Sequence, residues 1–247
     1  MQQLNAYMLP SLAHPHDMAG KTVIVVDILR ATTTIAASLN NGAVAVIPCL
    51  EVAEARILAS QHRATGTKTL LAGERKGIQV DGFDLGNSAL DYDSETVEGC
   101  LIVFTTTNGT KAMMRCVGAA RLLTGAFANL NATWNAVSQD SDIEVVCAGT
   151  DGVVTREDVL FAGALAERAI LANSQCRIND QAQLALDAWR SLRGDCSMDL
   201  AAALRDTQGG RNLLAIGHEQ DISNAAEVDT IDIATELDLA TWQIRAV

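Results

Sequence analysis

Several features that would assign a protein to a common class are scarce in this sequence or missing from it. Aromatic residues make up only 4% of the 247 residues, so the core must be built mainly from Ala, Val, Ile and Leu. No apolar run approaches the roughly 18–20 residues that span a bilayer. Residues 1–12 lack the basic start and long apolar stretch of a signal peptide. We therefore expect a soluble, cytoplasmic protein that does not enter a membrane.

Basic residues are also scarce. The chain has 18 Lys and Arg against 30 Asp and Glu, which gives a formal net charge of −12. A surface with this charge repels nucleic acid and anionic lipid, so we expect neither as a partner. It also repels an anionic substrate. A phosphate site in this chain must therefore supply local compensation from Arg or Lys, helix N-termini or a divalent cation.

The familiar short motifs of catalysis and metal binding are missing as well. The chain contains no GxGxxG, HExxH or GxSxG, and GKT at 20–22 precedes a predicted strand instead of following one, so it is not a P-loop. The four histidines have no metal-ligand spacing. No CxxC pair occurs, which favours buried thiols over disulfides or a zinc site. The six cysteines are Cys49, Cys100, Cys116, Cys147, Cys176 and Cys196.

What the sequence does contain is a regular alternation of apolar runs and helical patterns. This alternation is typical of an α/β sandwich with a mostly parallel sheet, and continuous runs such as VIVV fit a sheet covered on both faces. The predicted strands are 21–27, 43–48, 68–73, 101–104, 121–124 and 143–147, and the predicted helices between and after them are 32–40, 51–62, 109–117, 129–137 and 157–171.

The C-terminal part of the chain has a different pattern. Residues 179–226 are predicted to be helical, with a break at Gly209-Gly210, and residues 229–234 are predicted to form a last strand. We find no internal repeat, low-complexity tract or clear linker. The sequence therefore predicts a single domain over residues 1–247.

The richest cluster of polar residues follows the first predicted strand, which ends at Asp27. A carboxylate there can ligate a hard cation, and the guanidinium of Arg30 can bind two phosphate oxygens at once. Thr32 and Thr33 open the next predicted helix, whose free N–H groups attract anions. Each residue has an ordinary structural explanation, such as helix capping, but the combination favours a binding site.

Comparable clusters follow three later predicted strands. Because ligands bind beyond the carboxyl ends of parallel strands, we expect these residues to meet at one edge of the sheet. Hydroxyl and N–H groups at the start of the 109–117 helix suit a phosphate cradle, whereas Thr155 and Asp158 are interpreted as helix caps. The candidates are Glu74, Arg75, Lys76, Asp84 and Asn87 after the third strand, Thr105, Thr106, Thr107, Asn108 and Gly109 after the fourth, and Asp151 after the sixth.

Several of these segments, taken together, resemble the 2-phosphosulfolactate phosphatase family in order and spacing. The resemblance extends over roughly residues 20–230. It departs from the family pattern at Asp81 and Ala89, where the family usually has proline, and in the stretch from Thr230 onward. The matching segments are VDILRATTTIAASLNNGA (26–43), LAGERKGIQVDGFDLGNS (71–88), TTTNGTKA (105–112), CAGTDGVVTREDVLFAGA (147–164) and GGRNLL (209–214) with Gly217 and Asp221.

The resemblance implies a three-layer α/β/α fold and a magnesium-dependent phosphatase. Such an enzyme hydrolyses 2-phospho-3-sulfolactate, or a related phosphorylated 2-hydroxy acid, to the hydroxy acid and phosphate, a step of coenzyme M biosynthesis. On this hypothesis Asp27 and Asp151, with Glu74 or Asp84, hold one Mg²⁺. Arg30 and the 105–109 loop, with Thr106 and Asn108 as catalytic groups, bind the phosphate. The other substrate-binding candidates are Thr32, Thr33 and Asn87, and Arg75, Lys76 or Arg211 for the carboxylate or sulfonate.

Three questions stay open at this point. The nucleophile is either water activated by the metal or Asp27 itself, which would form an aspartyl phosphate. The same phosphate cradle also suits a magnesium-dependent phosphotransferase or lyase, and the acid-rich loops suit a non-enzymatic protein that binds a metal or anion. Nothing in the sequence identifies a subunit interface, so a homo-oligomer is neither predicted nor excluded.

Overall fold

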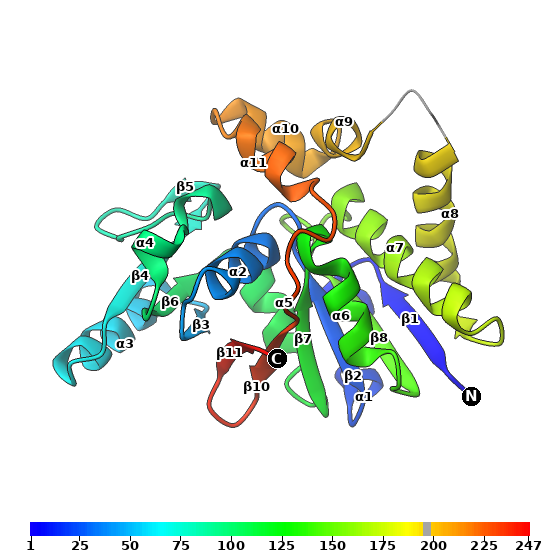
Figure 1. Cartoon of the computed structure of the whole chain (residues 1–247), viewed down its shortest axis with the longest axis horizontal. Coiled ribbons are helices and arrows are strands. Elements are labelled where there is room, and N and C mark those ends of the chain that lie inside the picture. The colour runs from blue at the N-terminus through cyan, green and yellow to red at the C-terminus, as the bar shows by residue number, and fades with distance from the viewer. Residues whose placement is uncertain (195–198) are drawn as a thin grey trace.

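The structure is a computed structural model that describes residues 1–194 and 199–247. Its centre is one 11-stranded sheet, with strand order β5-β4-β6-β3-β11-β10-β7-β2-β8-β1-β9 among the described residues (Figure 1). The strands are β1 (Gln3–Tyr7), β2 (Thr22–Val26), β3 (Ala45–Cys49), β4 (Thr69–Arg75), β5 (Ile78–Gln79), β6 (Leu101–Thr105), β7 (Arg121–Gly125), β8 (Asp142–Cys147), β9 (Arg177–Ile178), β10 (Thr235–Asp238) and β11 (Gln243–Ala246).

Helices connect most of these strands, as the alternating pattern predicted. They are α1 (Pro15–Met18), α2 (Ala31–Asn40), α3 (Val52–Ala64), α4 (Ser94–Val97), α5 (Gly109–Arg115), α6 (Leu130–Val137), α7 (Arg156–Ala172), α8 (Asp180–Gly194), α9 (Leu200–Arg205), α10 (Gln208–Ala215) and α11 (Glu219–Ala225), with short 3-10 turns η1 (Pro10–Leu12), η2 (Ala89–Asp91) and η3 (Phe127–Asn129). Among the described residues, no helix is both long and apolar enough to cross a membrane.

The sheet consists of two parallel blocks joined by an antiparallel hairpin. Strands β4, β6 and β3 form one block, and β7, β2, β8, β1 and β9 form the other. The hairpin β10–β11 lies between the blocks and pairs antiparallel with β7 on one side and β3 on the other. The prediction of a mostly parallel or mixed sheet is therefore confirmed.

Alternate residues of the central strand β2 belong to two different apolar clusters. Ile24 and Val26 pack into a cluster with side chains of α6, α7 and α8, whereas Val23 and Val25 pack into another with side chains of α1 and α5. Because successive side chains of a strand point to opposite faces, helices cover both faces of the sheet. This arrangement confirms the α/β/α sandwich.

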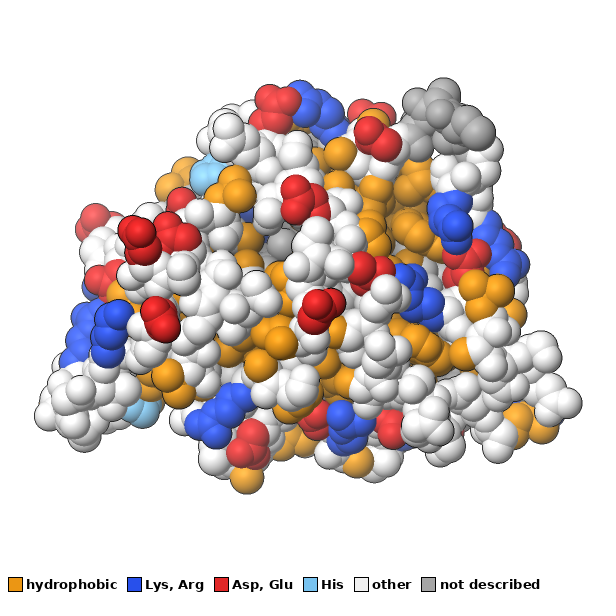
Figure 2. Space-filling view, viewed as in Figure 1, with side chains coloured by type: hydrophobic (Ala, Val, Ile, Leu, Met, Phe, Trp, Pro, Cys, Tyr) orange, Lys and Arg blue, Asp and Glu red, His pale blue; other side chains and the backbone are white. Residues whose placement is uncertain are grey.

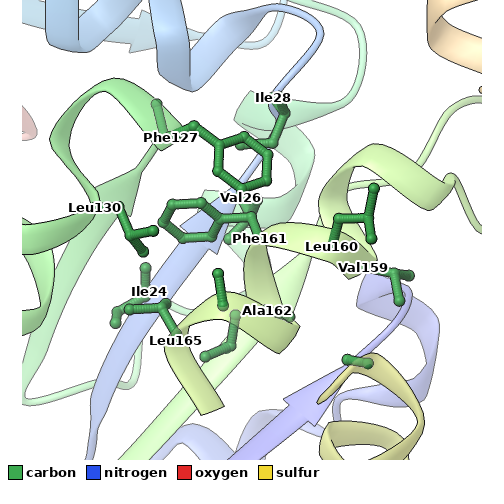
Figure 3. Close-up of a cluster of buried hydrophobic side chains, with 14 of the residues drawn as sticks. Ile24, Val26, Ile28, Phe127, Leu130, Val159, Leu160, Phe161, Ala162 and Leu165 are labelled. Carbon is green, nitrogen blue, oxygen red and sulfur yellow. The ribbon is translucent and has the colours of Figure 1, made fainter. Parts of the chain in front are cut away.

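The first of these clusters is tightly packed beneath the loop that follows β2. Phe127 and Phe161 meet edge to face with their ring centroids 5.4 Å apart, and Figure 3 shows them between Ile28, Leu130 and the side chains of α7. Aromatic pairs in this geometry add to the stabilisation from burial. The core thus anchors the end of β2 and the start of α7, where the polar candidate residues begin.

Three predictions about elements were wrong. Residues 229–234 form no strand, because Asp229 N and Ile231 N donate to the carbonyls of Phe127 and Ala128 instead of pairing with the sheet. The strand β1 was missed because only Leu4 and Ala6 are buried in it, which makes a weak pattern. Gly209 and Gly210 do not interrupt a helix. They lie in the first turn of α10, behind its N-cap Thr207.

Four of the five cysteines that the structure describes are buried thiols, as predicted. Cys49, Cys100, Cys116 and Cys147 are free and buried, and Cys176 is free and half-buried. Cys196 lies outside the described residues. Figure 2 shows acidic and basic side chains interspersed over one face of the molecule, with apolar side chains between them.

Candidate active site

A cavity of about 420 Å³ lies beyond the carboxyl ends of β2, β4, β6 and β8, as the strand-end rule predicted. Residues of α10, which is far from these four strands in the sequence, form its other wall. The predicted residues that line it are Asp27, Arg30, Glu74, Lys76, Asn87, Thr106, Thr107, Asn108 and Asp151, and the sequence did not single out Leu29, Gly77, Thr150, Gly209, Asn212, Leu213, Ala215 or Ile216 as lining residues.

Asp27 is held at the end of β2 by the first turn of α2. Its Oδ1 accepts a hydrogen bond from Ala31 N at 3.3 Å. Its Oδ2 faces Gly109, where a Cβ would lie only 2.9 Å away, so a glycine is needed for the close approach of α5. Burial, with further contributions from the charges of Glu74 and Glu157, raises the pKa of Asp27 to about 7.

Glu74, near the end of β4, ties two loops of the cavity together. Its Oε1 accepts hydrogen bonds from the backbone N and the Oγ1 of Thr107, both at 2.9 Å. Its Oε2 accepts a hydrogen bond from Gly77 N at 2.7 Å. Both oxygens are therefore satisfied, and the carboxylate fixes the β6–α5 loop against the β4–β5 turn.

Arg30 is almost fully buried and bridges two distant parts of the chain. Its Nη1 donates to Asp221 Oδ2 on α11 at 2.5 Å, and its Nη2 donates to the Gly77 carbonyl at 2.6 Å. Asp221 was named in the sequence only as part of the family resemblance and was given no role. The one signal that could have identified it was an acid within an amphipathic helical stretch, which is too common to be informative.

The loop after β6 presents three polar side chains to the cavity. The Oγ1 of Thr106 lies 3.2 Å from the Oγ1 of Thr110 and accepts a hydrogen bond from Thr110 N, so it closes the first turn of α5. Thr107 is held by Glu74. Asn108 Oδ1 accepts a hydrogen bond from Asp151 N at 3.3 Å, which connects this loop to the loop after β8.

Asp151, Lys76 and Asn87 complete the polar lining. Asp151 and Lys76 both lie at left-handed backbone positions, with φ of 52° and 55°, so each side chain is presented by a tight turn. The side chain of Asn87 is buried, and its Oδ1 has no hydrogen-bond partner among the described residues. An orphaned buried oxygen in a cavity wall is unusual and points to a ligand.

Glu157 and Asp158 form a second group of buried acids behind the cavity. Thr155 and Asp158 were interpreted as helix caps, but Thr155, at the N-cap position of α7, makes no side-chain capping hydrogen bond. The carboxylate of Asp158 instead accepts hydrogen bonds from Ile28 N and Gly149 N, both at 2.9 Å. It therefore holds the loops after β2 and β8 together. Burial raises the pKa of Glu157 and raises that of Asp158 well above its ordinary value. Glu157 Oε2 has no hydrogen-bond partner among the described residues.

The remaining predicted residues lie outside the cavity lining, each held by another contact. The hydroxyls of Thr32 and Thr33 donate to the carbonyls of Asp27 and Ile28, and Gly109 packs against Asp27. Arg75 donates to Thr105 Oγ1 and Leu50 O, Asp84 pairs with Arg63 at 2.5 Å, and Arg211 donates to Asp206 O. Asp84 and Arg211 thus make contacts at the surface and do not line the cavity with the other candidate residues.

The oxygen atoms around the cavity suit a magnesium ion that keeps most of its water. Asp27 and Asp151 present carboxylates, and Asn87 presents the orphaned Oδ1. Oxygen donors of this kind, few in number, are how proteins bind Mg²⁺ beside a phosphate. In residues 1–194 and 199–247 no three His, Cys, Asp or Glu side chains cluster closely enough to enclose a metal by themselves. The lining therefore fits a hydrated ion and not an all-protein cage.

Comparisons with known proteins agree with one another. The family model described as 2-phosphosulpholactate phosphatase matches residues 7–239. A protein of Symbiobacterium thermophilum, described as a probable 2-phosphosulfolactate phosphatase, is 35% identical over 218 residues, covering 88% of this chain and 91% of the relative. Proteins of the same description from Caldanaerobacter subterraneus and Prochlorococcus marinus are each 35% identical, covering 95% and 92% of this chain and 95% and 93% of the relatives.

Proposed function

This chain belongs to the 2-phosphosulfolactate phosphatase family and is an enzyme of that kind, and from that premise we propose that it hydrolyses 2-phospho-3-sulfolactate to 3-sulfolactate and inorganic phosphate with the help of Mg²⁺. The observation that carries the proposal is the convergence of Asp27, Arg30, Lys76 and the 106–108 loop on one cavity. We also propose that related phosphorylated 2-hydroxy acids are accepted, and that the enzyme acts in the cytoplasm.

The charges around the cavity are the reason for including a cation in the proposal. Three carboxylates, those of Asp27, Glu74 and Asp151, line it together with two cations, Arg30 and Lys76, so the formal charge of the lining is −1. One of the two cations is already paired with Asp221. A substrate with a phosphate, a carboxylate and a sulfonate cannot bind there without additional positive charge. A divalent cation supplies it at short range, where screening by salt is weakest.

Asp27 and Asp151, with the Oδ1 of Asn87, are the residues that would hold this ion. When bound, Mg²⁺ supplies electrostatic stabilisation of the phosphoryl oxygens and makes a nearby water more acidic. A neighbouring cation would stabilise the ionised form of Asp27, whose pKa is raised by burial to about 7.

The protein's own groups account for binding and orientation of the phosphate. Arg30 has five N–H donors. Within the part of the chain that the structure describes, Asp221 and Gly77 accept two of them, which leaves three for the phosphate. Thr106, Thr107 and Asn108 surround the N-terminus of α5, which favours an anion. Lys76 is the remaining cation of the lining and is assigned to the carboxylate or sulfonate.

Two roles for Asp27 in the hydrolysis stay distinct. In the first, its carboxylate attacks phosphorus, the ester P–O bond breaks, the hydroxy acid leaves, and water then hydrolyses the aspartyl phosphate. In the second, Asp27 would hold the cation while water attacks phosphorus and the hydroxy acid leaves. Acid quenching of the enzyme during turnover of substrate labelled in the phosphate separates the two, because only the first leaves label on the protein.

The proposed activity is tested by phosphate release from a panel of phosphorylated 2-hydroxy acids that includes 2-phosphosulfolactate and phospholactate. We expect release that depends on added Mg²⁺, stops with EDTA and is fastest with the sulfonated substrate. Lys76→Ala is expected to raise KM most for the substrates with an additional acid group, by roughly tenfold for one lost charged hydrogen bond. Folded, magnesium-loaded protein that releases no phosphate from any member would contradict the proposal.

A further inference from the structure

Asp221 is a buried acid with several polar contacts that the proposed mechanism leaves without a role. It lies on α11 with about 5% of its surface exposed. Its Oδ2 accepts a hydrogen bond from Arg30 Nη1 at 2.5 Å, across 191 residues of sequence, and its Oδ1 accepts one from Ser88 Oγ at 2.5 Å. His218 Nδ1 lies 3.2 Å from Oδ2. Ser88 precedes η2 and His218 precedes α11, so Asp221 joins two further segments to the strand-end loop that carries Arg30.

The geometry of the pair constrains the direction of the guanidinium. Arginine is planar and presents its donors in a rigid fork, so fixing two of its nitrogens fixes the remaining donors. Asp221 takes Nη1, and the carbonyl of Gly77 takes Nη2. The two acceptors belong to different parts of the fold, α11 and the β4–β5 turn. Together they determine which donors face the cavity, whereas either contact alone would let the plane rotate.

Burial makes the charge of Asp221 as important as its position. The side chains of Arg30 and Asp221 are each only 4% exposed. A buried guanidinium without a counterion is strongly disfavoured and would be expected to turn toward water. Ser88 satisfies the second oxygen of Asp221 and keeps the carboxylate from rotating away from Arg30. Asp221 and Ser88 therefore hold the guanidinium of Arg30 in one orientation.

We propose that Asp221 is a positioning residue of the phosphatase reaction, which holds Arg30 in the direction that binds the substrate phosphate. This inference rests on the proposed function for the identity of the anion, and it gives the C-terminal helix α11 a part in the active site. The loss of Asp221 would remove no group that touches the substrate but would let the guanidinium of Arg30 turn away from the phosphate.

A double-mutant cycle on the full chain tests this dependence. The four proteins are the wild type, Asp221→Asn, Arg30→Gln and the double variant, assayed for kcat and KM with 2-phosphosulfolactate and Mg²⁺. Asp221→Asn keeps the shape of the side chain but removes its charge, and we expect kcat/KM to fall roughly 10–100-fold, as for supporting residues of other sites. In the Arg30→Gln background the same substitution is expected to change kcat/KM less than about threefold, because it acts through Arg30.

A merely structural role would give another pattern. If Asp221 only anchors α11, Asp221→Asn lowers kcat/KM by the same factor in both backgrounds, and that result overturns the inference. Ser88→Ala serves if Asp221→Asn does not fold, since it removes one donor to Asp221 and leaves the ion pair. It is expected to lower kcat/KM severalfold only when Arg30 is present. Asp232→Asn, a substitution of an exposed acid, is the matched control and should behave as the wild type.

The test also separates failure of the inference from failure of the proposed function. If the wild type releases no phosphate from the substrate panel, the same four proteins are titrated with inorganic phosphate in a calorimeter. Weaker phosphate binding on Asp221→Asn, seen only when Arg30 is present, supports the positioning role even then. Equal binding by the wild type and Asp221→Asn, or no binding by the wild type, overturns it.

Discussion

Two buried glutamates act on Asp27 from different parts of the fold, and their surroundings differ sharply. Glu74, on the β4 side of the cavity, accepts three hydrogen bonds from Thr107 and Gly77, so that both of its oxygens are satisfied. Glu157, on the α7 side, has one oxygen without a partner among the described residues. Both charges raise the pKa of Asp27, after the larger effect of burial.

The difference shows how one type of side chain can serve two purposes at a single site. The Glu74 carboxylate holds two loops together, and its hydrogen bonds offset the free-energy cost of burying it. Burial raises the pKa of Glu157, although hydrogen bonds from Thr207 and Gly209 act in the opposite direction. When Glu157 is ionised, its charge on the α7 side is only partly compensated, next to the carboxylate proposed to hold a cation. Such uncompensated charge is tolerated where it contributes to function.

The largest expected effect comes from removing the carboxylate on which both glutamates act. Asp27→Asn keeps an acceptor for Ala31 N, so the protein should fold, but it removes the charge proposed for nucleophilic attack or metal binding. We expect kcat for phosphate release to fall at least about 100-fold. The melting temperature at pH 8 in EDTA should not fall, because a buried charge of raised pKa has been removed.

Asp232→Asn is the control for the loss of one acidic charge, since Asp232 is exposed and away from the cavity lining. Retention of more than about a tenth of the wild-type kcat by Asp27→Asn would exclude both proposed roles of this carboxylate, since either accounts for 10²-fold or more.

A matched pair of substitutions tests the comparison itself. In Glu74→Gln an NH₂ group replaces one of the two accepting oxygens, so either Thr107 or Gly77 loses its partner. We expect a loss of roughly 1.5–3 kcal/mol in the free energy of unfolding, the range for hydrogen bonds to a charged group. Glu157→Gln removes charge but at most one satisfied oxygen, and it should cost less than Glu74→Gln in urea unfolding at pH 8.

Equal destabilisation by the two variants would show that the unpartnered oxygen of Glu157 has no energetic consequence. Glu74 and Glu157 would then not differ in how they contribute to stability. Circular dichroism of both variants at low urea checks that each starts from the same fold, which the linear extrapolation requires.

The strand-end loops could be predicted from the sequence because their signal is local. Asp27, Glu74 and the 106–108 loop each follow an apolar run directly, and a parallel sheet brings such positions together. Asp84 and Arg211 carry the same kind of local signal, but both make other contacts at the surface. Asp84 forms an ion pair with Arg63, and Arg211 donates a hydrogen bond to the carbonyl of Asp206. Whether a charged side chain faces the cavity or the surface depends on the contacts that it makes in the folded chain, which a local pattern does not reveal.

The contributions of the C-terminal helices could not be predicted for the same reason. Asp221 matters through contacts with Arg30 and Ser88, which are 191 and 133 residues away in the sequence. Glu157 looks like an ordinary acid in the first turn of a helix, where acids are common. Gly209 looks like a helix breaker, and only the packing of α10 against α7 explains it. Tertiary pairing of this kind overrides local propensity.

The glycine at this contact offers a way to disturb the α7 side alone. A Cβ at Gly209 would lie 2.0 Å from Glu157 Oε1, so Gly209→Ala must displace the carboxylate or the start of α10. We expect a loss of roughly 1–3 kcal/mol in stability, typical of overpacking in a close contact. Gly118→Ala is the matched control, because its nearest heavy atoms lie 4.0 Å away. Glu157→Ala should reduce the cost of Gly209→Ala if the carboxylate is what the methyl group meets.

The smallest expected effect is a change in how stability depends on pH. Burial raises the pKa of Glu157 above its ordinary value of 4.5, so the native state binds more protons than the unfolded chain at pH values above that. Ionisation of Glu157 therefore lowers the free energy of unfolding of the wild type as the pH rises through this range. Glu157→Gln does not titrate at this position, so its stability relative to the wild type should increase from pH 4.5 to pH 8. Urea midpoints measured in EDTA at pH 4.5, 6 and 8 test this, and a difference that stays constant with pH would mean that Glu157 ionises as freely in the folded protein as in the unfolded chain.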